Sequence, residues 1–185
     1  MSSTLSISVG KGTYSGDQNT NITFPNVPTT LEANDATFNC SVFSFGLSGF
    51  IASNDLYISG ATISNCFSSV VMSQNGSLSF NYSQIKTIIN EDLNAYSAGI
   101  IFIPGSTGSL TVANSIFYSV QIAISINNAT SLSLSNSNFQ DTSFYSVYIN
   151  DIKSVSVVEC IFTNCAPFGI YAHQSDVSGS FISSQ

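Results

Sequence analysis

The chain has 185 residues, of which 43% are hydrophobic and only 7% are charged, and its net charge at pH 7 is −7. Without a basic cluster, such a chain is not expected to bind nucleic acid or an anionic membrane surface, and no apolar run is long enough for a transmembrane helix. Its β-branched and aromatic content argues against disorder, so we expect one folded domain over residues 1–185.

The first residues, MSSTLSISVG, lack the charged and apolar regions of a signal peptide. Two explanations remain open: the protein stays inside the cell, or Met1 begins a piece of a longer, secreted protein. We expect residues 1–30 to form an opening or capping coil, and residues 31–185 to form the regular coils.

An internal repeat runs from residue 31 onward, in which a Leu or Val is followed seven residues later by an Ile or Phe. The pairs are Leu31/Phe38, Leu56/Ile63, Leu78/Ile85, Leu110/Phe117, Leu132/Phe139 and Val155/Phe162, with Val177 beginning a seventh. Successive first members are 22 to 25 residues apart, except for one interval of 32. A second apolar residue two positions after most first members gives the alternation of a β-strand.

A third apolar run closes most copies, as in Val70-Val71-Met72 and Gly169-Ile170-Tyr171. Three short strands in a repeat of this length predict an all-β, right-handed parallel β-helix solenoid of about seven coils. Leucine-rich repeats have a similar period, but they require more leucines at fixed offsets and usually a helix. We expect no helix longer than about two turns, and a loop insertion in the longest copy near residues 89–98.

Two stretches resemble known β-helices. ISVGKGTYSG followed by NITF resembles the opening coil of the pectin-lyase-like group, and VSVVECIFTNCAPFGIYA resembles non-enzymatic repeats of that group in surface proteins of protists and bacteria. The resemblance implies the β-helix fold and, as a first expectation, activity on carbohydrates.

The catalytic residues of that group do not appear at matching positions. Its lyases use Arg or Lys as base, but this chain has no arginine and only isolated lysines, and the hydrolase motifs are missing. In the repeat alignment Asp141 and Glu159 face no second acid in the adjacent coil, as a pair of catalytic carboxylates would require. We therefore expect no enzyme activity, no cofactor and no metal site, with His173 as a surface residue.

The four cysteines fall close to the bends of the repeat. Cys40 and Cys66 occupy nearly the same place in consecutive coils, about 5 Å apart, which is within disulfide range. Cys160 and Cys165 lie in one coil. The sequence leaves open whether all four are buried thiols or whether some are oxidised, with Cys40–Cys66 as the preferred bridge; oxidation would place the protein outside the reducing cytosol.

A possible binding surface lies on the third strands of the last coils. If Val147 and Ile149 point inward, then Tyr148 and Asn150 point outward, and Tyr171 and His173 follow them one coil later. Aligned tyrosines beside Asn and His suit a sugar ring or a protein partner, although tyrosines stacked across coils also stabilise a sheet without any ligand.

Five Asn-x-Ser/Thr sequons begin at Asn21, Asn39, Asn75, Asn81 and Asn128. This is about the number that chance gives in a chain so rich in Asn, Ser and Thr, so the sequons permit N-glycosylation without indicating it.

The preferred function is that of a non-catalytic structural module of an extracellular or cell-surface protein, which possibly stacks end to end into a filament. Its partners would then be further copies of itself or flanking domains of a longer chain, with glycans as a further possibility. The alternatives are a carbohydrate-binding or adhesive module that uses the Tyr face and, with less support because Thr-x-Thr ladders are missing, an ice-binding protein.

Overall fold

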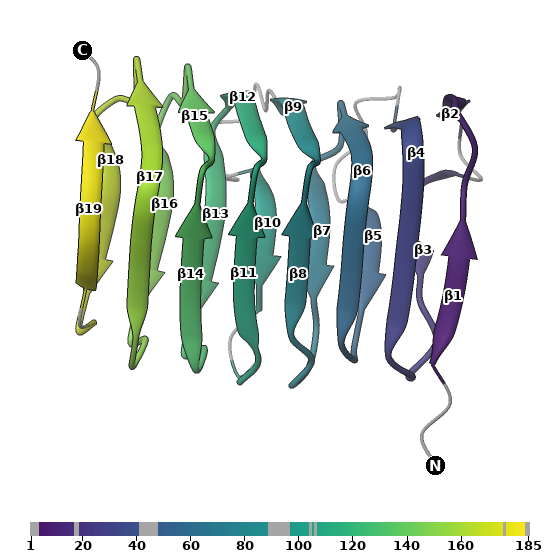
Figure 1. The fold of residues 1–185 in the computed structure, drawn as a ribbon, viewed down its shortest axis with the longest axis horizontal. Helices are drawn as coiled ribbons and strands as arrows, with labels where there is room; N and C mark the ends of the chain where they lie inside the picture. Colours follow the sequence, from purple (N-terminus) through teal and green to yellow (C-terminus); the bar gives the residue numbers. More distant parts are fainter. Residues whose placement is uncertain are drawn as a thin grey trace.

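The structure, a computed structural model, describes residues 4–16, 19–40, 48–88, 97–103, 105, 107–175 and 177–183. Its strands form two sheets, which face each other along the length of the solenoid (Figure 1). The twelve-stranded sheet contains β1 (Leu5–Ser8), β2 (Gly12–Ser15), β4 (Thr29–Asn39), β6 (Leu56–Ser64), β8 (Leu78–Asn81), β9 (Gln84–Ile88), β11 (Ser109–Ala113), β12 (Ile116–Val120), β14 (Ser131–Ser135), β15 (Asn138–Gln140), β17 (Val155–Thr163) and β19 (Val177–Ser183). The seven-stranded sheet contains β3 (Ile22–Thr23), β5 (Ser48–Ala52), β7 (Ser68–Met72), β10 (Ala98–Phe102), β13 (Ile122–Asn127), β16 (Tyr145–Asn150) and β18 (Phe168–His173).

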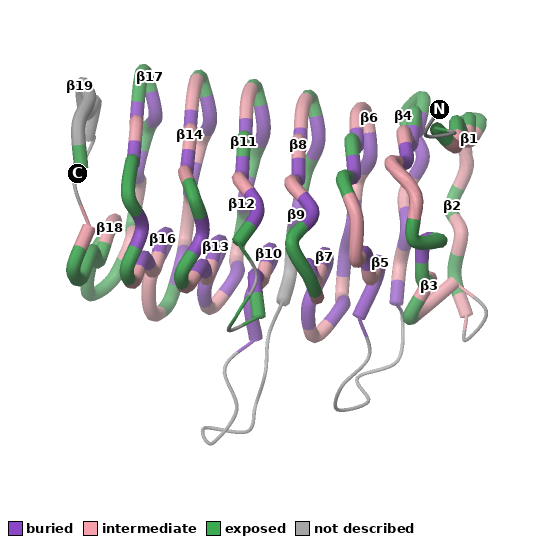
Figure 2. The backbone as a smooth tube through the Cα atoms, turned by 90° about the horizontal axis from the view of Figure 1, so that it is seen from below, coloured by how far each residue is buried: buried purple, intermediate pink, exposed green. Residues whose placement is uncertain are grey.

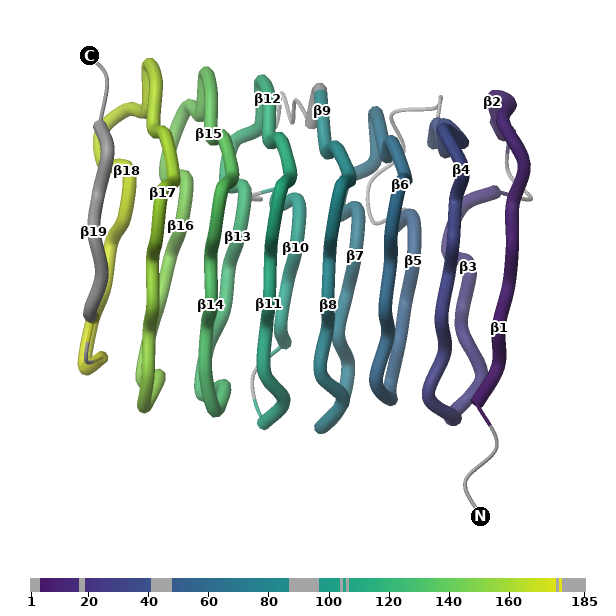
Figure 3. The backbone as a smooth tube through the Cα atoms, viewed as in Figure 1, coloured from purple at the N-terminus to yellow at the C-terminus, as the bar shows by residue number. Residues whose placement is uncertain are grey.

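These strands wind into a parallel β-solenoid of about six turns, close to the seven coils expected (Figure 3). The first and second strands of each coil lie in the twelve-stranded sheet, where they merge into one long strand in β4, β6 and β17, and the third strand lies in the other sheet. All the recorded strand pairings are parallel, as in β11 with β14 and β13 with β16. The predicted fold class is confirmed, and the described ranges contain no α-helix.

The strand register confirms most of the repeat alignment. The first anchors from Leu56 onward stack directly on one another across the coils: Leu56, Leu78, Leu110, Leu132, Val155 and Val177. The alignment of Leu31 is wrong, because Thr29 stacks on Leu56 and Leu31 stacks two residues further on, on Ile58. A bulge between Glu32 and Ala36 absorbs the two extra residues, so that Phe38 and Ile63 are paired as expected.

The N-terminal segment is built like the coils that follow it. Leu5 pairs with Thr29 through β1, Tyr14 pairs with Phe38 through β2, and β3 pairs with β5. The expected opening coil within residues 1–30 therefore stacks in register on the next coil. The insertion expected near residues 89–98 falls largely on residues 89–96, outside the described residues, and Ala98 already begins β10.

The coil bends use residues with left-handed backbone, and thirteen described residues other than glycine have a positive φ. The bend between first and second strands uses Gly60, Tyr82, Asn114, Asn136 and Glu159, and the next bend uses Asn65, Ser119, Asp141 and Asn164. Asn and Asp tolerate this conformation better than other residues with a side chain. The interpretation of Asn65 and Asn164 as turn residues therefore fits the backbone; Asp141 occupies the same bend as these two, and Glu159 occupies the preceding bend.

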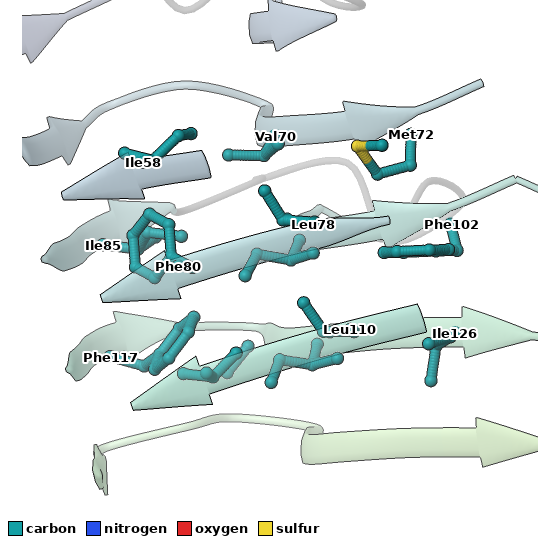
Figure 4. Close-up of a cluster of buried hydrophobic side chains, with 14 of the residues drawn as sticks. Ile58, Val70, Met72, Leu78, Phe80, Ile85, Phe102, Leu110, Phe117 and Ile126 are labelled. Carbon is teal, nitrogen blue, oxygen red and sulfur yellow. The ribbon is translucent and has the colours of Figure 1, made fainter. Parts of the chain in front are cut away.

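The core lies between the two sheets and is filled by inward-pointing side chains, of which Figure 4 shows a cluster from Ile58 to Ile126. Phe117, Phe139 and Phe162 form a continuous stack, with ring centroids 4.9 Å apart at each step and ring planes within 8° of parallel. Figure 2 shows buried residues along the inside of each coil and more exposed residues around β18. Each coil buries its apolar residues against its neighbours, which explains how so weakly apolar a repeat folds.

A column of buried serines runs beside the core at the bend after the first strands. The Ser83 amide donates to Ser115 Oγ at 3.3 Å, and the Ser115 amide donates to Ser137 Oγ at 3.2 Å. Each of the serine hydroxyls in turn donates to the backbone carbonyl of the residue two positions earlier in the sequence. Cys160 takes the next place in this column. These serines satisfy backbone amides that the bend withdraws from the strand ladder.

Candidate binding surface

A group of aromatic side chains lies on the outer face of the last two strands of the seven-stranded sheet. We call this group, with one polar pair, the aromatic patch; its members are Phe144, Tyr145, Tyr148, Asn150, Phe168, Tyr171 and His173. Strands β16 and β18 pair in register, which places Tyr148 against Tyr171 and Tyr145 against Phe168. The two predicted tyrosines are thus brought together as the alternation of these strands required.

The rings of the patch stack in two columns along the solenoid. Tyr148 and Tyr171 have centroids 5.5 Å apart and planes within 6°, and Tyr145 and Phe168 have centroids 6.2 Å apart and planes within 10°. Tyr145 also contacts Tyr171 at 5.4 Å, which joins the columns. Phe168 is 54% exposed and Tyr171 is 38% exposed, whereas the other rings are half-buried. The most accessible aromatic surface therefore belongs to β18.

Sequence reasoning missed Tyr145 and Phe168. Strict alternation from Val147 would place Tyr145 inside, but Ser146 and Val147 are both fully buried, because the chain turns a corner there. Tyr145 is consequently on the outside. The available signal was the 23-residue spacing of Tyr145 and Phe168, equal to that of Tyr148 and Tyr171.

The polar members of the patch bind each other. His173 Nδ1 lies 2.9 Å from Asn150 Oδ1, and the two residues are paired across β16 and β18. The patch includes no Lys, Asp or Glu. It combines aromatic edges with one amide–imidazole pair, a surface suited to an uncharged ligand.

Five of the described carboxylates lie at bends or accept a hydrogen bond. Asp141 Oδ1 accepts a hydrogen bond from Asn164 Nδ2 at 3.0 Å, and Asp55 Oδ1 accepts one from the Ser77 amide at 2.8 Å. Asp35, Asp151 and Glu159 lie at bends with positive φ. Within the described ranges no group of three or more His, Cys, Asp or Glu side chains is arranged to hold a metal ion.

Cys40 and Cys66 are joined by a disulfide that links β4 to the bend after β6, with Cα atoms 5.0 Å apart. Cys160 and Cys165 are free thiols. Burial raises the pKa of the Cys160 thiol, and Cys165 Sγ donates to the Phe139 carbonyl at 3.4 Å. The preferred bridge is thus the one in the structure, and the other two cysteines serve as small buried or half-buried side chains.

A shallow groove of about 250 Å³ crosses the outer face of the twelve-stranded sheet where β1, β4, β6, β8 and β11 begin. It is lined mainly by hydroxyl side chains, together with Asp55 and the ring of Tyr57. The volume of this groove is below that of an ordinary ligand pocket, which is at least about 300 Å³.

Residues 98–183, from β10 to β19, match the family model described as a right handed beta helix region. No curated protein and no solved structure matches the chain. Among the described residues, no helix is long and apolar enough to cross a membrane. The match covers somewhat less than half of the chain, and it agrees with the parallel strand register seen throughout the described solenoid.

Proposed function

We propose that this chain is a non-catalytic structural module of an extracellular or cell-surface protein. The observation that carries the proposal is the use of its polar side chains, which hold one coil to the next. The buried serines accept hydrogen bonds from amides of the preceding coil, Asn65 Nδ2 donates to Asn39 Oδ1 at 3.0 Å, and Asn164 donates to Asp141. Polar side chains that form hydrogen bonds between adjacent coils make the solenoid rigid, as a structural scaffold requires.

The disulfide supports the extracellular part of the proposal. A bond between Cys40 and Cys66 persists in an oxidising compartment and is reduced in most cytosols. The measurement is thiol titration of the protein isolated from its native source under denaturing, alkylating conditions. Two free thiols per chain fit the proposal, and four would contradict it.

End-to-end assembly is the finer part of the proposal. Both sheets add each new strand in parallel, so a second copy or a flanking segment of a longer chain can extend them in the same way. Light scattering and electron microscopy of the parent beside an Ile7→Asp variant test this idea, because Ile7 packs half-buried against the core in the outermost strand β1. If the parent stays monomeric at high concentration, stacking of copies is contradicted, and only extension by a flanking segment of a longer chain is left.

The non-catalytic part of the proposal has its own test. Incubated with pectin, polygalacturonate and common neutral glycans, the protein should release neither reducing ends nor unsaturated products. Turnover that disappears on changing Asp141, Glu159 or His173 would contradict it.

A carbohydrate-binding or adhesive role is the second candidate, favoured by the exposed rings of Phe168 and Tyr171. Affinity electrophoresis through gels containing neutral polysaccharides is the appropriate assay. Tyr171→Ala should abolish any retardation, whereas Tyr118→Ala, at a ring of similar exposure on the twelve-stranded sheet, should leave it unchanged. Equal effects of the two substitutions would exclude the patch as the binding site.

A further inference from the structure

Five sequons occur in the chain, which is about the chance number, so the pattern by itself cannot separate them. The structure does separate them, because their asparagines lie in different surroundings. Modification at the side-chain Nδ2 requires an accessible amide, and a folded protein that carries the sugar must leave room for it outside the sheets.

Asn75 and Asn128 lie in bends that lead from a third strand to the next first strand. Asn75 is between β7 and β8, and Asn128 is between β13 and β14. Both residues are exposed, and among the described residues neither side chain has a hydrogen-bond partner. The backbone at Asn128 is held in place, with φ of 57° and its amide donating to the Asn150 carbonyl. Both amides are therefore available without disturbing a ladder.

Asn39 and Asn81 are the opposite case, because both are half-buried within strands. Asn39 directly precedes the disulfide cysteine Cys40, and its Oδ1 accepts a hydrogen bond from Asn65. Asn81 Nδ2 donates to Ser79 Oγ at 3.0 Å, and Ser83, the hydroxyl residue of its sequon, is buried in the serine column. An oligosaccharide on either asparagine would displace these contacts.

Asn21 falls between the two groups. It is exposed, but its Oδ1 accepts a hydrogen bond from the Ser48 amide at 2.7 Å, which fixes the amide group at the start of β3. Asn21 is not part of the inference.

We propose that Asn75 and Asn128 carry N-linked oligosaccharides and that Asn39 and Asn81 do not. In the transfer, Nδ2 of the asparagine forms a bond to the anomeric carbon of a lipid-linked oligosaccharide pyrophosphate. The bond from that carbon to the phosphate oxygen breaks, the lipid pyrophosphate leaves, and the amide proton passes to a base of the transferase. The inference rests on the proposed extracellular location.

The two sites share one edge of the solenoid. The strands that precede them, β7 and β13, are separated by β10 alone, so their bends are two coils or about 10 Å apart. Oligosaccharides at this edge would hinder lateral contacts there, and the one on Asn128 would lie beside Asn150, the patch residue whose carbonyl accepts from the Asn128 amide.

The test is expression of the full chain with a cleavable secretion signal in a eukaryotic host. The secreted protein is trimmed with an endoglycosidase that leaves one sugar, and mass spectrometry assigns that sugar to each asparagine. Asn75→Gln and Asn128→Gln should each remove one oligosaccharide, and Asn81→Gln, the matched control, should remove none. After enzymatic removal of the sugars, Asn75→Gln should keep the thermal midpoint of the parent. Asn128→Gln, at a position with φ of 57°, and Asn81→Gln, which loses its bond to Ser79, should each lower the midpoint by about 2 to 4 °C.

The outcomes distinguish this inference from the proposed function. Secreted, folded protein that lacks sugar at Asn75 or Asn128, or that carries it at Asn39 or Asn81, overturns the inference and leaves the structural role standing. A chain that is not secreted even when all five asparagines are replaced by Gln contradicts the extracellular location, and the inference falls with it.

Discussion

The two ends of the solenoid are stabilised in different ways. From β10 to β17 the coils repeat with little variation, and the Phe117, Phe139 and Phe162 rings continue one column with almost parallel planes; a register shift appears in this half at the last step, where β17 pairs with β19. In the N-terminal coils the corresponding column changes from Tyr14 and Phe38, whose planes differ by 24°, to isoleucine, and a bulge interrupts β4. The disulfide joins the two strands on either side of this irregular step.

The difference indicates that a covalent bond and a ladder of stacked side chains serve the same purpose in a β-helix. Where coil follows coil in strict register, many small non-covalent contacts repeat and add up. Where the register shifts, fewer contacts repeat, and a cross-link that limits the unfolded chain compensates for them. Each of the following experiments tests one side of this contrast.

The largest effect is expected from Phe139→Ala in the regular region. Phe139 is fully buried and stacks on a ring above and below, so the substitution should lower the free energy of unfolding by about 3 to 5 kcal/mol. Urea denaturation followed by circular dichroism measures it. Phe38→Ala in the irregular region should cost less, because Phe38 retains 5% exposure, its ring is tilted by 24° from that of Tyr14, and Phe50 packs against it edge-on. An equal or larger loss at Phe38 would remove the contrast.

The second effect is loss of the disulfide. Replacing both Cys40 and Cys66 by Ala should lower the free energy of unfolding by about 3 kcal/mol, given their sequence separation of 26. A reducing agent should destabilise the parent by a similar amount and leave the double variant unchanged. The control is Cys165→Ser, a free thiol whose replacement should preserve the sensitivity of the parent to reduction. Equal urea midpoints for the parent and the double variant would show that the bond contributes nothing.

A smaller effect is expected from Ser115→Ala in the serine column. The change leaves the Ser83 amide without its acceptor in a buried site, at a cost of about 1 to 3 kcal/mol. Hydrogen exchange at the Ser83 amide should accelerate by the corresponding factor. Ser133→Ala, on the half-buried outer face of β14, should change stability by less than about 0.5 kcal/mol. Similar losses in both variants would mean that the column has no special role.

The smallest effect concerns pH and Cys160. Burial raises the pKa of this thiol above its ordinary value of 9.0, while hydrogen bonds with the backbone of Ser137 and Val158 act in the opposite direction. As pH rises, the Cys160 thiol therefore ionises in the unfolded chain before it ionises in the folded protein. The contribution of this thiol to the free energy of unfolding is complete below about pH 9 and is lost as pH rises through the pKa of the folded state. Between about pH 8 and 10 the parent should lose more stability than Cys160→Ser, as measured by urea midpoints. Parallel pH profiles would contradict this expectation.

The fold could be predicted because each coil repeats the same few inward positions. The spacing of Leu56, Leu78 and Leu110 determines how coils stack, and these residues stack as expected. Leu31 was assigned to the wrong level because seven residues separate it from Phe38, as in later coils, while the true spacing runs from Thr29 through a bulge. A bulge changes backbone path without changing composition, so periodicity alone does not reveal it.

The candidate binding surface was only half predictable. Tyr148 and Tyr171 follow from strand alternation, but Tyr145 precedes a corner where two consecutive residues, Ser146 and Val147, point inward. Similarly, the choice between buried thiols and a disulfide depended on the separation of Cys40 and Cys66 across coils, which spacing suggests and only three-dimensional register decides.

The left-handed bends have a consequence for how such a chain can change over generations. At the bend after the first strand, five equivalent positions with one backbone conformation hold four different residue types: Gly60, Tyr82, Asn114, Asn136 and Glu159. The corner thus sets the path of the chain almost independently of the group it displays, at a conformational cost of about 1 kcal/mol for residues other than Gly, Asn or Asp. A lineage can therefore exchange the chemistry along an entire edge of the solenoid, coil by coil, while its interior stays the same.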